Sequence, residues 1–447
     1  MAIVVFDIGK TNVKLSLVEG GAIRHTLSKP NISLPGPPYL HFDAEANWNF
    51  LLQGFAKLAG MARITDIVPV AHGAACALVD ADGNLALPLL DYEQPIENDG
   101  YDQVKAPFQE TFTPKMANGL VFGRQLYWQS RTFPEGFART KHILGYPQYW
   151  SFRLTGRAAS EVTAIGCHSG LWRPAEGTFS SFTERMGWRH LFPPMLKAGD
   201  VLGPVLPEIR RRTGLPEDCR VRVGIHDSNA SFLRHRLARP IPFAVASTGT
   251  WVVCMAAGTD PRGMPENRGC LANVNALGEP VATCNFMGGR EFAEQTRGLN
   301  GCVTTLESAA EVLDRGSILI PPLNDGGGPF IGAPIGGPSG VPTATDEQSV
   351  ARASLYLALM TDYCFDLIKA RGPVIVEGSL TGNHAYLAAL ASLRKAGGVL
   401  VSNDTTGTVS GAALLADVKI ADEPEPVEPL DLPMDAYRKR WREALPA

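Results

Sequence analysis

Near the amino terminus, residues 3–18 read IVVFDIGKTNVKLSLV. The run at 3–6 is β-branched and aromatic, which favours a strand, and the run at 13–18 alternates apolar and polar residues, as a half-buried strand does. Between them lies a polar stretch that contains Gly9, as a tight turn requires. A third run follows at 22–27, so this part of the sequence predicts an antiparallel meander of three strands.

The first turn of this meander has the residue types of a phosphate-binding loop. Glycine lets backbone N–H groups approach phosphate oxygens, and Lys and Thr side chains add donors. Asp7 stands beside the turn at the end of the first strand, where a carboxylate would hold Mg²⁺ through water. Ordinary hairpins with solvated lysines are abundant, so the turn taken alone is better explained as a hairpin. The candidate nucleotide ligands here are Gly9, Lys10, Thr11, Asn12 and Lys14.

A similar pattern recurs near the middle of the chain. An apolar run at 243–246 is followed by the small polar turn STGT at 247–250 and by a second apolar run at 251–255. The recurrence is a weak internal duplication, and it adds a second candidate phosphate turn. A plain hairpin is again the alternative. The candidate ligands in this turn are Thr248, Gly249 and Thr250.

A third candidate segment, EGSLTGN at 377–383, joins a predicted strand at 374–376 to a predicted helix at 383–396. Its small residues let a flat ligand lie against the backbone, while Asn383 would bond the edge of the ligand or cap the helix. The Walker pattern GxxxxGK[ST] is absent from the sequence, as is a GxGxxG after a strand, so ATP would bind on another scaffold. The candidate ligands are Gly378, Ser379 and Asn383.

An acid follows a predicted strand in the segment VRVGIHDSNA at 221–230. Asp227 begins a helical stretch there, where it would cap the helix through Ser228 and Asn229. A carboxylate presented on a rigid element at a strand end would also serve as a general base. As a lone feature, the cap is the favoured interpretation.

The order of these four segments resembles that of the FGGY carbohydrate kinases, in the superfamily of actin and the sugar kinases. The resemblance runs from residue 2 to about residue 416, and further matching segments lie at 42–48, 149–156, 160–163 and 405–416. Within the family, the chain is most similar to the rhamnulokinase and fuculokinase branch. That similarity rests on GIHD at 224–227, on 247–251 and on NFMG at 285–288.

The resemblance implies two ribonuclease-H-like α/β lobes, as in actin-like ATPases, with a deep cleft between them. It implies ATP-dependent phosphorylation, with Mg²⁺, of a hydroxyl of a ketose, with C1 of L-rhamnulose or L-fuculose as the first expectation. By the same resemblance, Asp227 is the proton acceptor, Thr248 binds phosphate and Gly378 lies near the adenine and ribose. The implied sugar ligands are His72, Gly73, His226 and Asn285.

Three departures from the family pattern put the identity of the sugar in doubt more than the reaction. Glu377 replaces a glycine of the adenosine segment, the sequence Asp91-Tyr92-Glu93 stands where such kinases often have Asp-Xaa-Arg, and the chain is short for the family. A kinase of another pentulose or polyol, such as ribulose, xylulose, erythritol or glycerol, stays open. So does a catalytically silent sugar sensor, although a silent protein needs no acid at position 227.

Composition limits the function classes and the domain number. The net charge is −4 without a basic block, which argues against nucleic acid as a partner. No apolar stretch approaches the roughly 18 residues of a membrane span, so we expect no membrane and a cytoplasmic protein; a homodimer stays open. The eight cysteines lack CxxC spacing, so we expect no structural zinc. A proline-containing stretch at 236–242 predicts a sugar-binding lobe at 1–236 and an ATP-binding lobe at 237–447.

Overall fold

The computed structural model describes residues 2–299, 304–404 and 406–446. The chain forms two compact units, and each is described by itself. The first unit contains residues 2–239, 272–279 and 406–421; the second contains the rest of the described chain. The change at Arg239 to Pro240 lies close to the boundary expected at 236, but two short segments of the later chain belong to the first unit. A single division of the sequence does not separate the units.

The first unit contains a sheet with the strand order β14-β15-β6-β1-β2-β3, and β16 also pairs with β6. The predicted meander is present, since β1, β2 and β3 pair in antiparallel fashion, while β6 and β15 are parallel to β1 and to β6. Its strands are β1 (Ala2–Ile8), β2 (Asn12–Glu19), β3 (Ala22–Pro30), β6 (Ile64–Ala71), β14 (Val201–Pro204), β15 (Arg220–Arg222) and β16 (Ile225–His226).

Strand β1 supplies side chains to both faces of this sheet, because successive residues of a strand point to opposite sides. Phe6 and Ile8 join the cluster that contains the apolar side of α1 (Ala44–Ala59). Ile3 and Val5 join a different cluster, with residues of α10 (Asp227–Ala238) and α15 (Gly407–Leu414). Asp7 continues the series of Ile3 and Val5, so it belongs to the α10 side of the strand.

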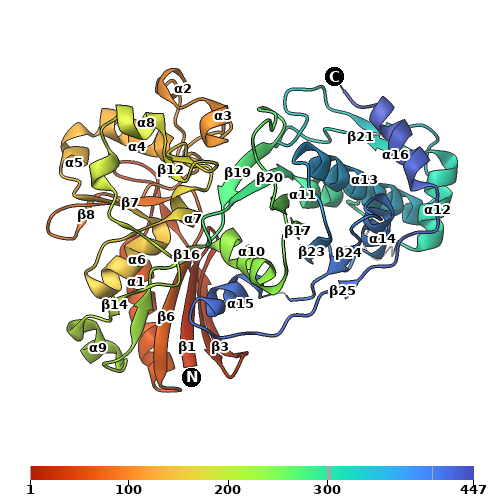
Figure 1. The fold of residues 1–447 in the computed structure, drawn as a ribbon. Coiled ribbons are helices and arrows are strands. Elements are labelled where there is room, and N and C mark those ends of the chain that lie inside the picture. Colours follow the sequence, from red (N-terminus) through yellow and green to blue (C-terminus); the bar gives the residue numbers. More distant parts are fainter. Residues whose placement is uncertain (1, 300–303, 405, 447) are drawn as a thin grey trace. The chain divides into compact units, whose positions relative to one another are not determined.

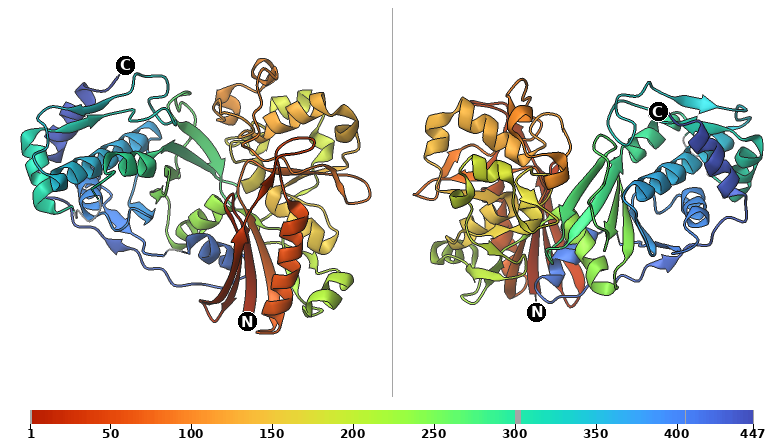
Figure 2. Two further views of the ribbon diagram at one scale, coloured as in Figure 1. Left: turned by 180° about the vertical axis from the view of Figure 1, so that it is seen from behind. Right: turned by 45° about the horizontal axis from the view of Figure 1, so that its top comes forward.

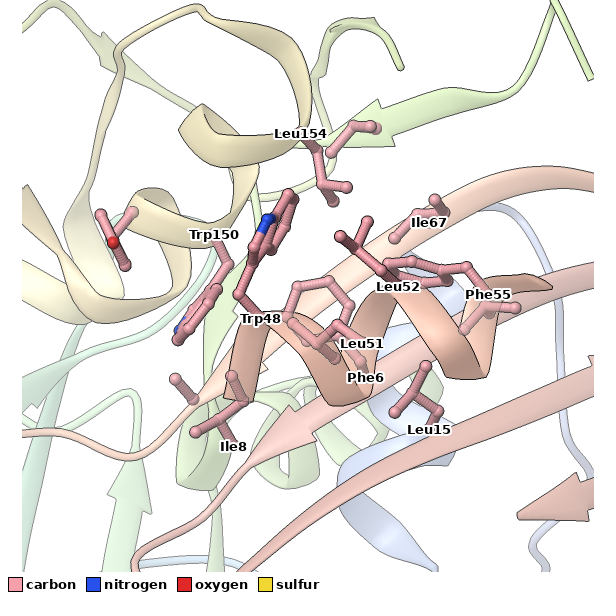
Figure 3. Packing of buried hydrophobic residues seen from close by; sticks show 14 of the residues in the cluster. Phe6, Ile8, Leu15, Trp48, Leu51, Leu52, Phe55, Ile67, Trp150 and Leu154 are labelled. Atoms are coloured by element: carbon pink, nitrogen blue, oxygen red, sulfur yellow. The ribbon is translucent and has the colours of Figure 1, made fainter. Parts of the chain in front are cut away.

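The helical spacing of apolar residues at 46–59 predicts an amphipathic helix. Helix α1 forms there and covers one face of the sheet with its apolar side (Figure 3). The side chain of Asp43 caps the helix by accepting a hydrogen bond from the Ala46 N–H at 2.9 Å. Phe55 meets Phe6 edge to face at 6.0 Å between ring centroids. Trp48 stacks on Trp150 of α6 (Tyr146–Thr155) at 6.4 Å, so this core joins the helices to the meander.

Helix α15 explains why residues 406–421 belong to the first unit. It packs against α10, and the two helices touch closely enough that a Cβ added at Gly411 would lie 1.7 Å from the Ala230 carbonyl oxygen. Only glycine fits such an approach of two backbones. Apolar residues of both helices then cover the sheet face that carries Ile3 and Val5.

The second unit has a sheet with the order β19-β20-β18-β17-β23-β24-β25. Its strand β17 is antiparallel to β18 and parallel to β23, as β1 is antiparallel to β2 and parallel to β6. The weak duplication in the sequence is therefore a duplication of sheet topology (Figure 1). The strands are β17 (Phe243–Thr248), β18 (Val252–Ala257), β19 (Cys270–Val274), β20 (Pro280–Phe286), β23 (Val374–Gly378), β24 (Val399–Val401) and β25 (Glu425–Pro426).

The helices of the second unit lie at one side of its sheet in both further views (Figure 2). Helix α16 is docked onto the second unit, because Trp441 is fully buried and its indole N–H donates to the Leu319 carbonyl at 2.8 Å. The part of the chain that the structure describes holds no helix long and apolar enough to cross a bilayer. The helices and remaining strands are α11 (Gly288–Gln295), α12 (Leu306–Arg315), α13 (Asp346–Leu367), α14 (His384–Leu393), α16 (Met434–Glu443), β21 (Ile318–Ile320) and β22 (Gly337–Ser339).

The first unit has many short elements between β3 and α9, and they carry several of the site residues. They are β4 (Ser33–Leu34), β5 (His41–Phe42), β7 (Cys76–Val79), β8 (Leu85–Leu87), α2 (Tyr101–Val104), α3 (Phe108–Thr111), α4 (Phe122–Thr132), α5 (Pro134–Ala138), β9 (His142–Gly145), β10 (Ser160–Glu161), α7 (Val162–Ile165), β11 (Trp172–Arg173), β12 (Thr178–Phe179), α8 (Ser181–Arg185), a 3₁₀ turn (Arg189–Leu191), β13 (Met195–Leu196) and α9 (Pro207–Thr213).

Candidate active site

Asp227 is the first residue of α10, directly after the short strand β16. Its Oδ1 atom accepts hydrogen bonds from the backbone N–H of Ser228 at 2.5 Å and from the hydroxyl of Ser228 at 3.2 Å. Its Oδ2 atom has no hydrogen-bond partner among the described residues, and 30% of the side chain is exposed. Helix α10 has His226 as its N-cap residue and no side-chain cap bond, so the predicted cap by Asp227 is not formed. One carboxylate oxygen is held by Ser228, while the other is open to accept a proton, and the role of Asp227 as a base stays a prediction.

Asp7 faces the α10 side of the sheet and lies within electrostatic reach of Asp227. Its Oδ1 atom is buried and has no hydrogen-bond partner in the described chain. Burial, together with the negative charge of Asp227, raises the pKa of Asp7 to about 7, although the positive charge of Lys14 opposes both effects. A divalent cation would supply the positive charge that these two acids lack, so the residues present fit the expected Mg²⁺.

The described residues contain no cluster of three or more His, Cys, Asp or Glu side chains arranged to hold a metal ion. Mg²⁺ is usually bound through one or two carboxylates, several waters and the phosphates of a substrate. Asp7 is then the residue of this unit that would hold such an ion.

His226 lies behind Asp227, and both of its ring nitrogens have partners in the protein. Its Nδ1 atom accepts a hydrogen bond from the side-chain amide of Asn229 at 3.1 Å, which leaves the proton on Nε2. Nε2 lies 3.2 Å from Oδ1 of Asp227 and 3.7 Å from Sγ of Cys167. The residue is only 5% exposed, and its contacts orient Asp227. The predicted contact of His226 with the sugar stays a prediction.

His72 has the opposite arrangement, with one ring nitrogen left open. Its Nδ1 atom donates to the Gly73 carbonyl at 2.6 Å, so Nε2 carries no proton, and Nε2 is buried without a partner among the described residues. Burial lowers the pKa of His72, which keeps the ring neutral. The ring packs against Tyr92 and Tyr146 at 5.4 and 5.0 Å. A buried acceptor without a donor costs free energy, and a substrate hydroxyl would relieve this cost.

Gly73 and His226 lie so close together that no side chain fits between them. A Cβ added at Gly73 would lie 2.8 Å from Nε2 of His226 and 3.5 Å from Sγ of Cys167. Any larger residue at position 73 would push the His226 ring away from Asp227. Gly73 therefore lies next to His226 through its backbone, and its predicted place near the sugar stays a prediction.

Lys10 and Lys14, both predicted phosphate ligands, have different surroundings. The Nζ atom of Lys10 binds both carboxylate oxygens of Asp91 and lies 3.0 Å from Glu93. Asp91 is fully buried, and it also accepts a hydrogen bond from Ser33. The departure Asp91-Tyr92-Glu93 thus has a structural role, because its two acids hold Lys10.

Lys14, in contrast, is exposed and makes no ion pair within the described chain. It lies directly across from Asp7 in the pairing of β1 with β2. Gly9 is held in the turn by its N–H bond to the Asn12 carbonyl at 2.9 Å, while the side chains of Thr11 and Asn12 are exposed. Lys14 is therefore the lysine of this hairpin that is free for an anionic ligand.

The second and third predicted nucleotide segments meet in the second unit. The hydroxyl of Thr248 donates to the Glu377 carbonyl at 2.6 Å and accepts from the Leu380 N–H at 3.0 Å. Gly378 has a φ of 94°, and a Cβ there would lie 2.0 Å from the Thr248 carbonyl oxygen. The two turns are thus joined through Thr248, whose hydroxyl is already occupied. Thr250 and Ser379 are exposed, and Gly249 is partly exposed.

Asn383 and Asn285 also lie in the second unit. The side chain of Asn383 caps α14 by accepting from the Tyr386 N–H at 3.0 Å, and its amide donates to Ser354 at 2.9 Å. The capped-helix alternative therefore describes its side chain. Asn285 lies in β20, partly buried, and its backbone N–H donates to the Gly269 carbonyl.

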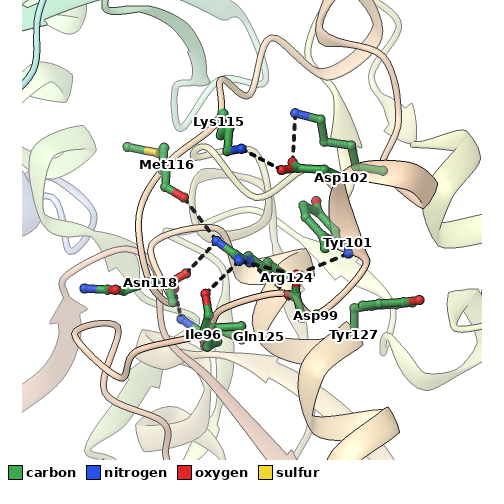
Figure 4. Close-up of polar contacts among 12 residues, drawn as sticks. Ile96, Asp99, Tyr101, Asp102, Lys115, Met116, Asn118, Arg124, Gln125 and Tyr127 are labelled. Carbon is green, nitrogen blue, oxygen red and sulfur yellow. Dashed lines mark hydrogen bonds and ion pairs between the residues drawn. The ribbon is translucent and has the colours of Figure 1, made fainter. Parts of the chain in front are cut away.

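A network around α4 holds the loop that follows Tyr92 (Figure 4). Arg124 binds Asp99 through Nε at 2.9 Å, and its guanidinium also donates to the carbonyls of Ile96, Met116 and Asn118. The next residue, Gln125, donates its side-chain amide to the carbonyls of Ala74 and Gly119. The loop is thereby fixed to the segment that contains His72 and Gly73.

Sequence reasoning did not single out Tyr92, which lies beside His72, or His168, which follows Cys167 beside His226. The ring of Tyr92 lies edge-on to His72, and burial and nearby acids, Asp227 among them, raise the pKa of Tyr92 to about 12. Its signal in the sequence was the departure at residues 91–93. His168 stands in the segment Gly166-Cys167-His168, which has no spacing that would have singled it out.

Comparison with known proteins gives consistent matches. Residues 240–425 match the family model described as "Carbohydrate kinase FGGY, C-terminal domain". L-fuculokinase of Escherichia coli (strain K12) is 24% identical over 269 residues, which are 57% of this chain and 56% of that protein. Xylulose kinase of the same strain is 22% identical over 234 residues, 47% of this chain and 45% of that protein. The chain thus matches about half the length of these curated relatives.

Among solved structures, a carbohydrate kinase from Novosphingobium aromaticivorans is 37% identical, with a TM-score of 0.93 over 99% of this chain and 97% of that chain. The xylulose kinase from Rhodospirillum rubrum is 19% identical, with a TM-score of 0.83 over 99% and 98%. The second likeness concerns the fold alone.

Proposed function

Because the chain belongs to the FGGY carbohydrate kinase family, we propose that it transfers the γ-phosphoryl group of ATP to a hydroxyl of a ketose, with Asp227 as the base. One observation carries the assignment of the base. Oδ1 of Asp227 is held by Ser228, whereas Oδ2 has no partner in the described chain and the side chain is partly exposed. A carboxylate fixed through one oxygen and open at the other suits a general base.

In the proposed reaction, Oδ2 of Asp227 accepts the proton of the sugar hydroxyl. The hydroxyl oxygen forms a bond to the γ-phosphorus, the bond between that phosphorus and the β–γ bridging oxygen breaks, and ADP leaves. Mg²⁺, bound to the phosphates and held by Asp7 through water, would neutralise charge on the transferred group. Lys14, across from Asp7, would add a positive charge on the same side of the hairpin.

The second unit would bind the nucleotide through its two joined turns. Thr248 ties the turn at 248–250 to the turn at 377–380, so its hydroxyl acts on ATP through the geometry of both turns. Gly249, Thr250 and Ser379 present backbone and hydroxyl groups at the surface for the phosphates and ribose.

For the sugar, we propose a ketose phosphorylated at its C1 hydroxyl, with L-fuculose or L-rhamnulose as the first candidates. His72 supports a polyhydroxylated ligand, because its buried Nε2 lacks a donor. The match to L-fuculokinase supports the rhamnulokinase and fuculokinase branch. The match to xylulose kinase keeps D-xylulose and other pentuloses as the alternative. Since a single methyl group discriminates by only about 10- to 200-fold, the matching pentuloses are expected as weaker substrates.

A substrate panel with ATP and Mg²⁺ tests the proposal. ADP release is measured with L-fuculose, L-rhamnulose, D-xylulose, D-ribulose, erythritol and glycerol, and Asp227→Asn serves as the inactive control. We expect one ketose to exceed every polyol in kcat/KM by tenfold or more. Preference for a polyol would reject the ketose assignment, and sugar binding without turnover would support a sensor instead of a kinase.

A further inference from the structure

His168 has a backbone conformation that is uncommon for residues other than glycine. Its φ is 33°, in the left-handed region that side chains with a Cβ seldom adopt. Such conformations cost free energy and persist where the surrounding structure requires them, which is frequently at functional sites. Cys167 and Ser169 on either side are buried, whereas the His168 side chain is only partly buried.

The hydrogen bond of His168 fixes its tautomer. Its Nδ1 atom lies 3.0 Å from the Leu120 carbonyl oxygen, and since a carbonyl only accepts, Nδ1 carries the proton. Nε2 is therefore an acceptor. Nε2 has no hydrogen-bond partner among the described residues. The atom is not fully buried either, so it is accessible to a ligand.

Two chains of contacts place His168 beside the sugar ligands of the first unit. The preceding residue, Cys167, has its Sγ atom 3.7 Å from Nε2 of His226. On the other side, the loop that presents the Leu120 carbonyl is held by Gly119, whose N–H donates to the Tyr92 carbonyl at 2.9 Å. Gln125 fixes the same loop to the Ala74 carbonyl, one residue beyond Gly73.

From this geometry we propose that His168 binds the sugar by accepting, through Nε2, a hydrogen bond from a hydroxyl other than the one that is phosphorylated. The inference rests on the proposed kinase function and concerns the choice among sugars. Burial, followed by His226, lowers the pKa of His168 to about 4, so the ring is a neutral acceptor at physiological pH. Once a sugar covers Nε2, an epimer whose hydroxyl points elsewhere leaves this acceptor unpaired and is rejected by a large factor.

The test compares His168→Ala, His168→Gly and His168→Gln with wild type. Both Ala and Gly remove the imidazole ring, but only Gly adopts the left-handed backbone without strain. Equal effects of the two variants would therefore show that the loss of the ring, and not backbone strain, is the cause. Gln keeps an acceptor near the position of Nε2. The matched control is His190→Ala, an exposed histidine of the same unit that lies outside the site.

Each variant is assayed with two epimer pairs, L-fuculose with L-rhamnulose and D-xylulose with D-ribulose. We expect Ala and Gly to raise the KM for the best sugar at least tenfold, with the KM for ATP changed less than twofold. The preference within one epimer pair should fall at least fivefold, and Gln should restore part of it. A loss that is equal for all four sugars, or an unchanged KM for sugar, would overturn the proposal.

Sugar binding without ATP, measured by calorimetry on the same proteins, separates this inference from the proposed function. If wild type binds a sugar without phosphorylating it, the kinase proposal fails, and the epimer preference in binding still tests His168. If wild type phosphorylates a sugar and the variants keep its epimer preference, the His168 proposal alone fails. Absence of both binding and turnover with all four sugars would reject both.

Discussion

Lys10 and Asp91 lie 81 positions apart in the sequence, and Nζ of Lys10 is 2.6 Å from Oδ1 of Asp91. The lysine also lies over the rings of Phe42 and Tyr92, at 5.2 and 5.0 Å from their centroids. Asp91 is fully buried, so its charge depends on this partner. A residue expected to bind phosphate is thus bound within the protein and supports the segment that carries Tyr92.

Replacing Lys10 should therefore affect stability. Lys10→Met leaves the buried Asp91 carboxylate with only Ser33 and one backbone N–H, and removing one partner of a buried pair costs about 3 kcal/mol. The free energy of unfolding in urea measures this loss. Lys14→Met is the control, because Lys14 is exposed and its loss should change stability by less than about 0.5 kcal/mol while raising the KM for ATP. Equal stability of the two variants would refute the structural role of Lys10.

Replacing Asp227 should affect the chemical step. Asp227→Asn keeps an oxygen that can accept from Ser228 but removes the base, so kcat should fall by about 10² to 10⁴ with little change in ATP binding. Steady-state kinetics and nucleotide titration measure the two effects. The control Ser228→Ala keeps the backbone contact to Oδ1 and should lower kcat far less. An Asn variant with more than about half of the wild-type kcat would show that Asp227 is not the base.

Thr248 should contribute to stability and to ATP binding together. Thr248→Val removes the donor to the Glu377 carbonyl and the acceptor for the Leu380 N–H, both of which are buried contacts. We expect a loss of about 1 to 3 kcal/mol and a higher KM for ATP, with the KM for sugar nearly unchanged. Thr250→Val, at an exposed position, should raise the KM for ATP without this loss of stability. If Thr248→Val leaves the KM for ATP unaltered, the joined turns have no part in nucleotide binding.

Glu161 should make the stability of the protein depend on pH. Burial raises its pKa to about 7 from an ordinary 4.5, although Oε2 accepts hydrogen bonds from Thr163 and Ala164. Because the pKa of Glu161 is raised in the folded state, its contribution to the free energy of unfolding is present below pH 4.5 and is lost as pH rises through 7. Glu161→Gln stays neutral, so its free energy of unfolding relative to wild type should increase between pH 5 and pH 8, by about 2 to 3 kcal/mol.

The control for this pH series is Glu217→Gln, because the Glu217 side chain is 89% exposed. Its difference from wild type should stay flat over the same range. Thermal or urea unfolding at four or five pH values is sufficient. A flat difference for Glu161→Gln as well would contradict the effect of burial on this carboxyl.

Much of the fold was predictable because the signals are local. The alternation of apolar residues at 13–18 gave β2, and the spacing of apolar residues at 46–59 gave α1, whose observed bounds are Ala44–Ala59. The order of the motifs indicated the family, to which the chain does belong. The later segments at 272–279 and 406–421 belong to the first unit, which the proline-containing stretch at 236–242 does not reveal. For residues 406–421, packing of α15 on α10 decides their place.

The candidate site residues could be selected from the sequence by residue type and position. Their contacts in the folded protein were less predictable. Asp227 was identified by its place after a strand, but the partners of Thr248 lie about 130 positions away, and no local pattern records them. His226 was expected to touch the sugar, and that expectation stays untested, although both of its ring nitrogens contact protein atoms. The positive φ of His168 distinguishes this residue, but the angle is known only from the folded backbone.

The alternation along β1 limits how this protein can be altered. Phe6 and Asp7 are neighbours in sequence, yet one anchors α1 and the other faces α10. Insertion of one residue upstream within the strand would exchange these two faces, placing an acid against α1 and a phenyl ring where the acid stood. Protein engineers who lengthen the strand must therefore add residues in pairs. Deep mutational scans that include insertions should find two-residue insertions in β1 tolerated more often than single ones.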